Sequence, residues 1–233
     1  ADVLDIGGES TRPGYRPVPP DEQARRVVPV IRALRRQTET PISIDTTRAE
    51  VAAAALDAGA DWINDTTALA EDPGLARLAA RSGAPLILMH RFDPPRLDGA
   101  SPRGRALVVA CVATLEHRAE RAAEAGVERA RIVLDPGLGF GTLFLDNLTL
   151  MADVSPWRRL PYPLLFGPSR KSFLGQLTGR PASERIHGTA AAVATLALQG
   201  VEIVRVHDVA AMADVVAVAD ALRNARANDE NME

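Results

Sequence analysis

The sequence predicts an α/β fold of parallel strands covered by helices, and the arrangement we favour is a TIM-type (β/α)8 barrel. Seven short apolar runs alternate with alanine-rich stretches of helical spacing along the 233 residues. The runs stop abruptly at charged, amide or glycine residues, and no linker interrupts the alternation. Continuous apolar runs are typical of parallel strands that helices cover on both faces. Such units build either a closed barrel or an open doubly wound sheet.

A glycine-rich segment favours the barrel over the open sheet. An open nucleotide-binding sheet normally has a glycine-rich phosphate turn after its first strand. In this chain the glycine-rich segment, residues 135–141, follows a middle strand and lacks the G-x-G-x-x-G spacing. A complete barrel of this type has eight strands. We therefore expect the chain to lack the first strand, which would precede residue 1.

The elements follow one another in strict strand-then-helix order. The expected strands are the apolar runs, at residues 2–6, 41–45, 61–65, 85–89, 131–135, 163–167 and 202–206. The expected helices are the stretches of helical spacing, at residues 21–37, 48–58, 73–82, 103–125, 144–153, 182–199 and 209–226. Strong helix formers fill residues 49–56. Glycines end four of the helices just before the next strand, as is common at helix C-termini: Gly59, Gly83, Gly126 and Gly200.

The composition narrows the class of protein. The formal net charge is −3, so there is no basic excess to neutralise nucleic-acid phosphates or a membrane surface. The single cysteine, Cys111, rules out an internal disulfide and is compatible with a reducing cytoplasm. No apolar run approaches the ~20 residues of a membrane helix, and no signal-peptide pattern opens the sequence. We expect a cytoplasmic protein that binds a small polar molecule.

Three strand ends carry polar side chains that could hold a heterocycle. Asp45, Asn64 and Asp135 each follow an apolar run. A carboxylate buried at such a place needs donors, and an Asp with an Asn can accept and donate at the edge of a nitrogen heterocycle. Capping of the following helix is the alternative interpretation for each of them.

Two further strand ends carry cationic residues. Ser169 and Lys171 follow the sixth run, where a lysine can hold an anion or a ring carbonyl, although a solvated surface pair is also compatible. Arg205 and His207 belong to the seventh run, and the period-2 alternation of a strand places them on one face. Together they suit a pyrophosphate. The alternative is a buried arginine that pairs with a carboxylate of a neighbouring strand.

The remaining candidates lie in the loop after the first strand. Thr11 and Arg12 could clamp a carboxylate, but the loop also reads as an ordinary turn. The four histidines show no zinc-ligand spacing, and no nucleophile elbow is present. The sequence therefore favours chemistry by positioning and charge stabilisation over covalent catalysis.

Seven blocks, in order along nearly the whole chain, resemble dihydropteroate synthase. They are residues 5–14 (DIGGESTRPG), 44–46 (IDT), 59–65 (GADWIND), 88–90 (LMH), 134–141 (LDPGLGFG), 167–172 (GPSRKS) and 203–209 (IVRVHDV). The resemblance implies a single pterin-binding barrel domain over residues 1–226, with residues 227–233 as a flexible tail. It implies a transferase of folate biosynthesis. That enzyme joins p-aminobenzoate to 6-hydroxymethyl-7,8-dihydropterin diphosphate and releases diphosphate, with Mg²⁺, as a homodimer.

The resemblance also assigns roles to residues. The residues that would line the pterin pocket are Asp45, Asn64, Asp135 and Lys171, and the diphosphate would be held by Arg205 and His207. The residues that would face p-aminobenzoate are Thr11, Arg12 and Ser169. Phe140 would pack beside this substrate, and Gly167, also a substrate-binding residue, opens the GPSRKS block. The catalytic set would be Asp45, Asp135, Lys171, Arg205 and His207. No metal ligand is expected in this chain, because the family's Asn ligand would lie in a loop before Ala1.

The chain departs from the family pattern in three places, the first being the absent opening strand with its loop. Thr142 stands where the family usually has Lys, and residues 91–95 (RFDPP) replace the usual pattern after His90. The activity of the chain would also depend on the absent N-terminal loop. Two other functions remain compatible with the motifs: a non-catalytic pterin-binding paralogue, and a methyltransferase domain that binds methyltetrahydrofolate.

Overall fold

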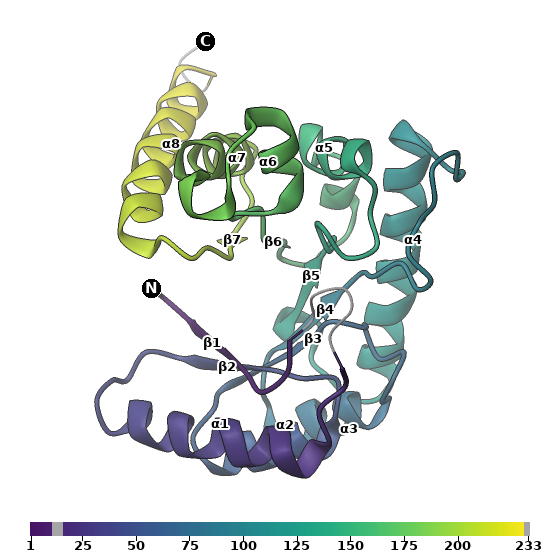
Figure 1. Cartoon of the computed structure of the whole chain (residues 1–233), viewed down its shortest axis with the longest axis vertical. Coiled ribbons are helices and arrows are strands. Elements are labelled where there is room, and N and C mark those ends of the chain that lie inside the picture. Colours follow the sequence, from purple (N-terminus) through teal and green to yellow (C-terminus); the bar gives the residue numbers. More distant parts are fainter. Residues whose placement is uncertain (11–15, 231–233) are drawn as a thin grey trace. The chain divides into compact units, whose positions relative to one another are not determined.

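The computed structural model describes the backbone of residues 1–10 and 16–230, so that residues 11–15 and 231–233 lie outside the description. The chain divides into two compact units (Figure 1). The first unit comprises Ala1–His90 and Leu115–Leu134, and the second comprises Arg91–Thr114 and Asp135–Glu233. Among the described helices, none combines the length and apolar character that a membrane crossing requires.

The first unit is built around a parallel sheet. Its strands pair in chain order, β1 (Leu4–Gly7), β2 (Ile42–Asp45), β3 (Trp62–Asp65), β4 (Leu86–Met89) and β5 (Ile132–Asp135). In the register, Gly7 lies opposite Asp45, and Asp45 lies opposite Asn64. Strands β2 to β5 are largely buried, as expected for parallel strands covered by helices, whereas Asp5 and Gly7 of β1 are exposed.

Helices α1 (Pro20–Arg35), α2 (Ala49–Asp57) and α3 (Gly74–Ser82) follow the first three strands, and α4 (Gly104–Glu124) and the short helix η1 (Arg129–Arg131) precede β5. Helix α1 packs against α2, and α2 packs against α3. Proline suits the first position of α1, because its fixed φ fits the helix and its missing N–H has no partner there. Gly83 ends α3 in the left-handed conformation expected of a C-cap glycine.

The second unit has a two-stranded parallel sheet, β6 (Leu165–Phe166) with β7 (Ile203–Val204). Its helices are α5 (Phe144–Ala152), η2 (Trp157–Arg159), α6 (Ser172–Thr178), η3 (Ala182–Glu184), α7 (Ile186–Leu198) and α8 (Val209–Glu230). Helices α7 and α8 pack against each other. Trp157, Phe166 and Phe173 are among the largest fully buried side chains here.

The second unit departs from the sequence prediction in three places. Strands β6 and β7 are each two residues long, so Arg205 and His207 lie beyond the end of a strand and not inside it. The predicted helix at 182–199 is divided into η3 and α7. Helix α6 was not predicted, because Gly175 lies in the middle of its seven residues and glycine is a weak helix former. The proposed tail at 227–233 includes the end of α8 and undescribed residues, and it stays a prediction.

Candidate functional site

In the first unit, Asp45 and Asn64 end neighbouring strands in direct register. Registered residues of parallel strands point to the same face of the sheet. Asn64 is 0% exposed, and neither its Oδ1 nor its Nδ2 has a hydrogen-bond partner among the described residues. A buried amide without partners is unusual and unfavourable, since it has lost its hydrogen bonds to water. A ligand that donates to Oδ1 and accepts from Nδ2 would restore both.

Neither residue caps a helix, so the capping interpretation is wrong for both. Helix α2 has Arg48 at its N-cap, and α3 has Pro73. The neighbouring Asp65 instead organises a local turn: it accepts from the backbone N–H and the hydroxyl of Thr67 and from the backbone N–H of Leu69. Burial raises the pKa of Asp65, and these hydrogen bonds oppose the rise. The carboxylate oxygens of Asp65 therefore stabilise the turn that follows β3.

In the second unit, Asp135 pairs with Arg205. The Arg205 Nη1 donates to Asp135 Oδ2 at 3.1 Å, and the backbone N–H of Gly137 donates to Oδ1 at 2.8 Å. The Asp135 side chain is 3% exposed, whereas that of Arg205 is 30% exposed. Burial raises the pKa of Asp135, and the nearby positive charges of Arg205 and Lys171 oppose the rise. Asp135 does not cap α5, which begins at Phe144. The contact agrees with the alternative interpretation of Arg205 in being an ion pair, but the arginine is partly exposed and Asp135 ends β5, which is not paired with β7.

The pairing leaves Arg205 suited to bind an anion as well. A guanidinium carries five N–H donors in a planar fork, so one arginine can engage a carboxylate and a phosphate together. Gly167 lies beside it, since a Cβ at Gly167 would stand 3.8 Å from the Cβ of Arg205. A guanidinium held at the edge of a buried carboxylate can still direct N–H donors at negative charge as it develops.

Lys171 lies over an aromatic ring. Its Nζ is 4.3 Å from the centroid of the Phe140 ring, a cation–π contact. Its aliphatic stem passes Gly139, where a Cβ would stand 3.2 Å from the Lys171 Cδ. Gly139 also has φ +79°, a conformation that favours glycine. The glycine loop (residues 137–142) therefore allows the lysine stem to pass close to its backbone.

Ser169 and His207 form the third pair. His207 Nδ1 lies 3.0 Å from the Ser169 hydroxyl oxygen, and the backbone N–H of His207 donates to the same oxygen at 3.2 Å. Next to this pair, Arg170 forms a two-point ion pair with Asp208, with Nε 3.0 Å from Oδ2. The structure thus joins residues 38 positions apart in the sequence at two adjacent points. Thr11 and Arg12, which were also predicted as site residues, lie outside the described residues.

Several residues that organise this region were not singled out from the sequence. Arg185 Nη1 donates to the backbone oxygens of Arg170, at 2.9 Å, and Lys171, at 3.3 Å. Thr142 and Asn147 hold the glycine loop, as described below. No sequence motif marks Arg185. Thr142 was noticed only because it stands where lysine is usual in the family that the chain resembles.

The described residues contain no group of three or more His, Cys, Asp or Glu side chains that could hold a metal ion. Magnesium in phosphate-transfer sites commonly has only one or two carboxylate ligands, with substrate oxygens and water completing its shell. The residues described here do not build a protein cage for such an ion. These residues fit a magnesium ion only if the oxygens of the substrate supply most of the ligands of the ion.

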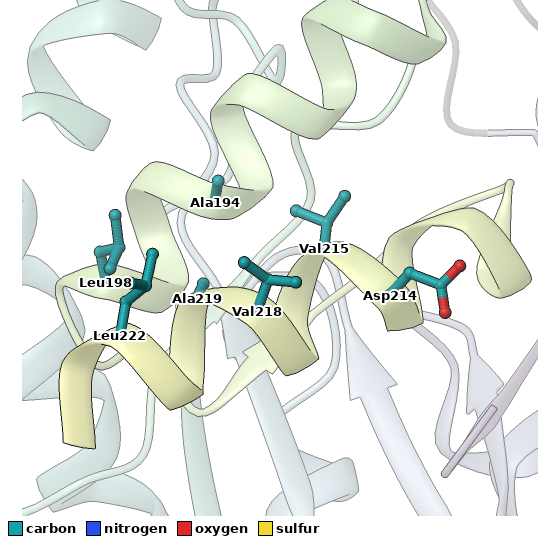
Figure 2. A pocket seen from close by; sticks show the side chains of 7 residues that line it. All are labelled: Ala194, Leu198, Asp214, Val215, Val218, Ala219 and Leu222. Atoms are coloured by element: carbon teal, nitrogen blue, oxygen red, sulfur yellow. The ribbon is translucent and has the colours of Figure 1, made fainter. Parts of the chain in front are cut away.

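The second unit also has an open apolar groove of about 350 Å³ along α7 and α8 (Figure 2). Its lining is almost entirely aliphatic: Ala194, Leu198, Asp214, Val215, Val218, Ala219 and Leu222. Val218 and Leu222 are more than half exposed. None of the predicted site residues lines this groove, so it is separate from the polar clusters.

Comparison with known proteins identifies the family. A family model described as "Pterin binding enzyme" matches residues 1–207. The dihydropteroate synthase of Synechocystis sp. is 44% identical over 95% of this chain and 77% of its own length. A solved structure of the Xanthomonas albilineans dihydropteroate synthase with 4-aminobenzoic acid is 42% identical, with a TM-score of 0.87, over 96% of this chain and 80% of that one.

A second solved structure, dihydropteroate synthase from Anaplasma phagocytophilum with bound 6-hydroxymethylpterin-monophosphate, is 36% identical with a TM-score of 0.89. It covers 95% of this chain and 89% of that one. These likenesses confirm the TIM-type α/β fold class and the transferase function expected from the motifs. The chain belongs to the dihydropteroate synthase family of pterin-binding enzymes.

Proposed function

We propose that this protein joins p-aminobenzoate to 6-hydroxymethyl-7,8-dihydropterin diphosphate, giving 7,8-dihydropteroate and diphosphate. The observation that carries the proposal is Asn64, whose buried amide is unpartnered within the described residues and stands in register with Asp45. A pterin ring offers adjacent donors and acceptors in one plane, so it would supply the missing hydrogen bonds. Membership of the family and the ligands of the relatives support the same choice.

The roles of the site residues are part of the proposal. Asp45 and Asn64 hold the pterin ring, as do Asp135 and Lys171, while Arg205 and His207 receive the diphosphate. Thr11, Arg12 and Ser169 face p-aminobenzoate, and Phe140 packs beside it. The ion pair of Arg205 with the buried Asp135 supports this assignment, because it fixes the arginine beside a group that would otherwise be unfavourably buried.

The reaction proceeds by displacement at the methylene carbon of the pterin substrate. The C–O bond to diphosphate breaks, and its electron pair leaves with the diphosphate, whose charge Arg205 and His207 stabilise. Positive charge that spreads into the pterin ring is stabilised by the carboxylates of Asp45 and Asp135. The neutral amine of p-aminobenzoate forms the new C–N bond and then loses a proton, so no strong general base is required. When bound, Mg²⁺ would neutralise part of the diphosphate charge.

A homodimer and a cytoplasmic location complete the proposal. The aliphatic groove along α7 and α8 supports the dimer, because exposed apolar grooves of this kind are typical of association surfaces (Figure 2). The single buried cysteine supports a reducing compartment.

The test is turnover by the purified protein with both substrates and Mg²⁺. We expect dihydropteroate and diphosphate to appear in equal amounts, and we expect Lys171→Ala and Arg205→Ala to abolish turnover without unfolding the protein. Arg25→Ala is the matched control, since its side chain is 67% exposed and, among the described residues, pairs with the carboxylates of Asp21 and Glu22 in its own helix. Pterin binding without turnover would favour a non-catalytic paralogue. Normal turnover in either site variant would remove that residue from the proposed roles.

A further inference from the structure

The glycine loop passes between two close partners, both in the second unit. On one side, the Lys171 stem packs against Gly139. On the other, a Cβ at Gly141 would overlap the carbonyl oxygen of Phe92. Phe140 lies between the two glycines, and its ring contacts the Lys171 ammonium. The position of the ring therefore depends on how the loop is held at both ends.

Thr142 and Asn147 hold the loop from the side of α5. The backbone N–H of Gly139 donates to the Thr142 hydroxyl at 2.9 Å and to Asn147 Oδ1 at 2.7 Å. The Thr142 hydroxyl in turn donates to Asn147 Oδ1 at 2.9 Å. Asn147 Nδ2 donates to the backbone oxygen of Leu143 at 2.7 Å, which orients the amide. A single backbone N–H, next to Phe140, is thus fixed by two side chains that also bond each other.

The segment at residues 92–102 also holds the loop. Backbone N–H groups of Phe92 and Arg96 donate to the backbone oxygens of Phe140, at 3.1 Å, and Gly141, at 2.8 Å. The Arg96 side chain anchors this segment: its Nε donates to Asp146 Oδ2 at 2.8 Å, and both side chains are 6% exposed. Asp146 also accepts from the backbone N–H of Leu143. A buried, hydrogen-bonded ion pair of this kind favours a single geometry.

We propose that Thr142, Asn147 and Arg96 are positioning residues that place the Phe140 ring against Lys171 and thereby set the affinity for the aromatic amine substrate. The inference rests on the proposed function for its substrate, but the geometry of the loop can be tested without turnover. The hydroxyl of Thr142 is the group to test, because the near-isosteric change Thr142→Val removes its two hydrogen bonds and keeps the shape of the side chain.

The first measurement is the NMR chemical shift of the Lys171 side-chain protons, which the ring current of Phe140 moves upfield. We expect Thr142→Val to shift these protons back toward the values of a free lysine, and Thr142→Ser to retain the wild-type values. Thr114→Val is the matched control, because Thr114 is exposed and its hydroxyl donates to the backbone oxygen of Ala110 in its own helix. Unchanged Lys171 shifts in a folded Thr142→Val variant would overturn the inference.

The second measurement is steady-state kinetics of the same three variants. Thr142→Val removes both hydrogen bonds of the hydroxyl, but the Gly139 N–H keeps its bond to Asn147 Oδ1. We therefore expect the KM for p-aminobenzoate to rise by roughly 2- to 10-fold, on the order of the effect of one neutral hydrogen bond. The KM for the pterin diphosphate should not change, and Thr142→Ser should restore the wild-type value. Equal changes in both KM values, or no change in either, would contradict a positioning role. Absence of turnover in the wild-type protein would refute the proposed function alone, and the NMR result would still decide the inference.

Discussion

We predict that His90 makes the protein less stable as the pH falls from 7 toward 4.5. The residue directly follows β4 and is 7% exposed, and burial lowers its pKa to about 4 from 6.5. The unfolded chain therefore binds a proton between these values while the folded chain does not. Because the unfolded state carries more protons, the free energy of unfolding decreases as the pH decreases through this window.

The size of the effect follows from the two pKa values. Between pH 7 and pH 4.5, the two pKa values correspond to a decrease of about 2 kcal/mol in the free energy of unfolding from His90 alone. Urea unfolding at a series of pH values measures it, and His90→Gln, which does not titrate, is the comparison. Buried Asp65 and Asp135, whose pKa values are raised, act in the opposite direction, so the difference between wild type and variant isolates His90. Parallel pH profiles for the two proteins would refute the reasoning.

Two further predictions concern the second unit. Arg205→Gln should reduce the free energy of unfolding by about 2 kcal/mol, which is less than for a fully buried pair because Arg205 is partly exposed. The added change Asp135→Asn should recover much of this loss. Additive losses in this double-mutant cycle would show that the two residues are not coupled. Gly141→Ala should lower the Tm by several degrees more than Gly179→Ala. Both glycines have a similar positive φ, but only at Gly141 would the new Cβ overlap the Phe92 carbonyl oxygen. Equal Tm values would show that the structure relieves this overlap without cost.

Much of the fold could be predicted because hydrophobic periodicity reports burial directly. The runs that end at Asp45, Asn64 and Asp135 form strands, and their apolar residues are buried except for Trp62, which is partly exposed. The strand ends near residue 167 could not be placed by periodicity alone. Pro168 lacks an N–H and cannot extend the ladder beyond Phe166, so β6 and β7 stop after two residues although the apolar run continues to Val206.

The polar residues at the strand ends were predictable from the sequence, but the contacts among them were not, and their roles in a site stay a prediction. Polar residues that end parallel strands are visible in the sequence, and Asp45 and Asn64 stand in register as that pattern implies. Which side chain contacts which other is decided by tertiary packing. Arg205 reaches Asp135 across 70 sequence positions, and His207 contacts Ser169 across 38. No spacing rule encodes such distances.

The buried amide of Asn64 allows stability and binding to be separated. Asn64→Leu replaces an unpartnered polar group with an apolar one of similar volume, so we expect the free energy of unfolding of the ligand-free protein to rise by about 1–3 kcal/mol. Asn224→Leu is the control, since Asn224 is exposed and should change stability little.

The most direct test of the account is the affinity of wild type and Asn64→Leu for 6-hydroxymethyl-7,8-dihydropterin diphosphate, measured by calorimetry. The account predicts tight binding by the wild-type protein and loss of binding in a variant that is at least as stable. Equal affinity in the two proteins would contradict the claim that this strand end reads the pterin ring.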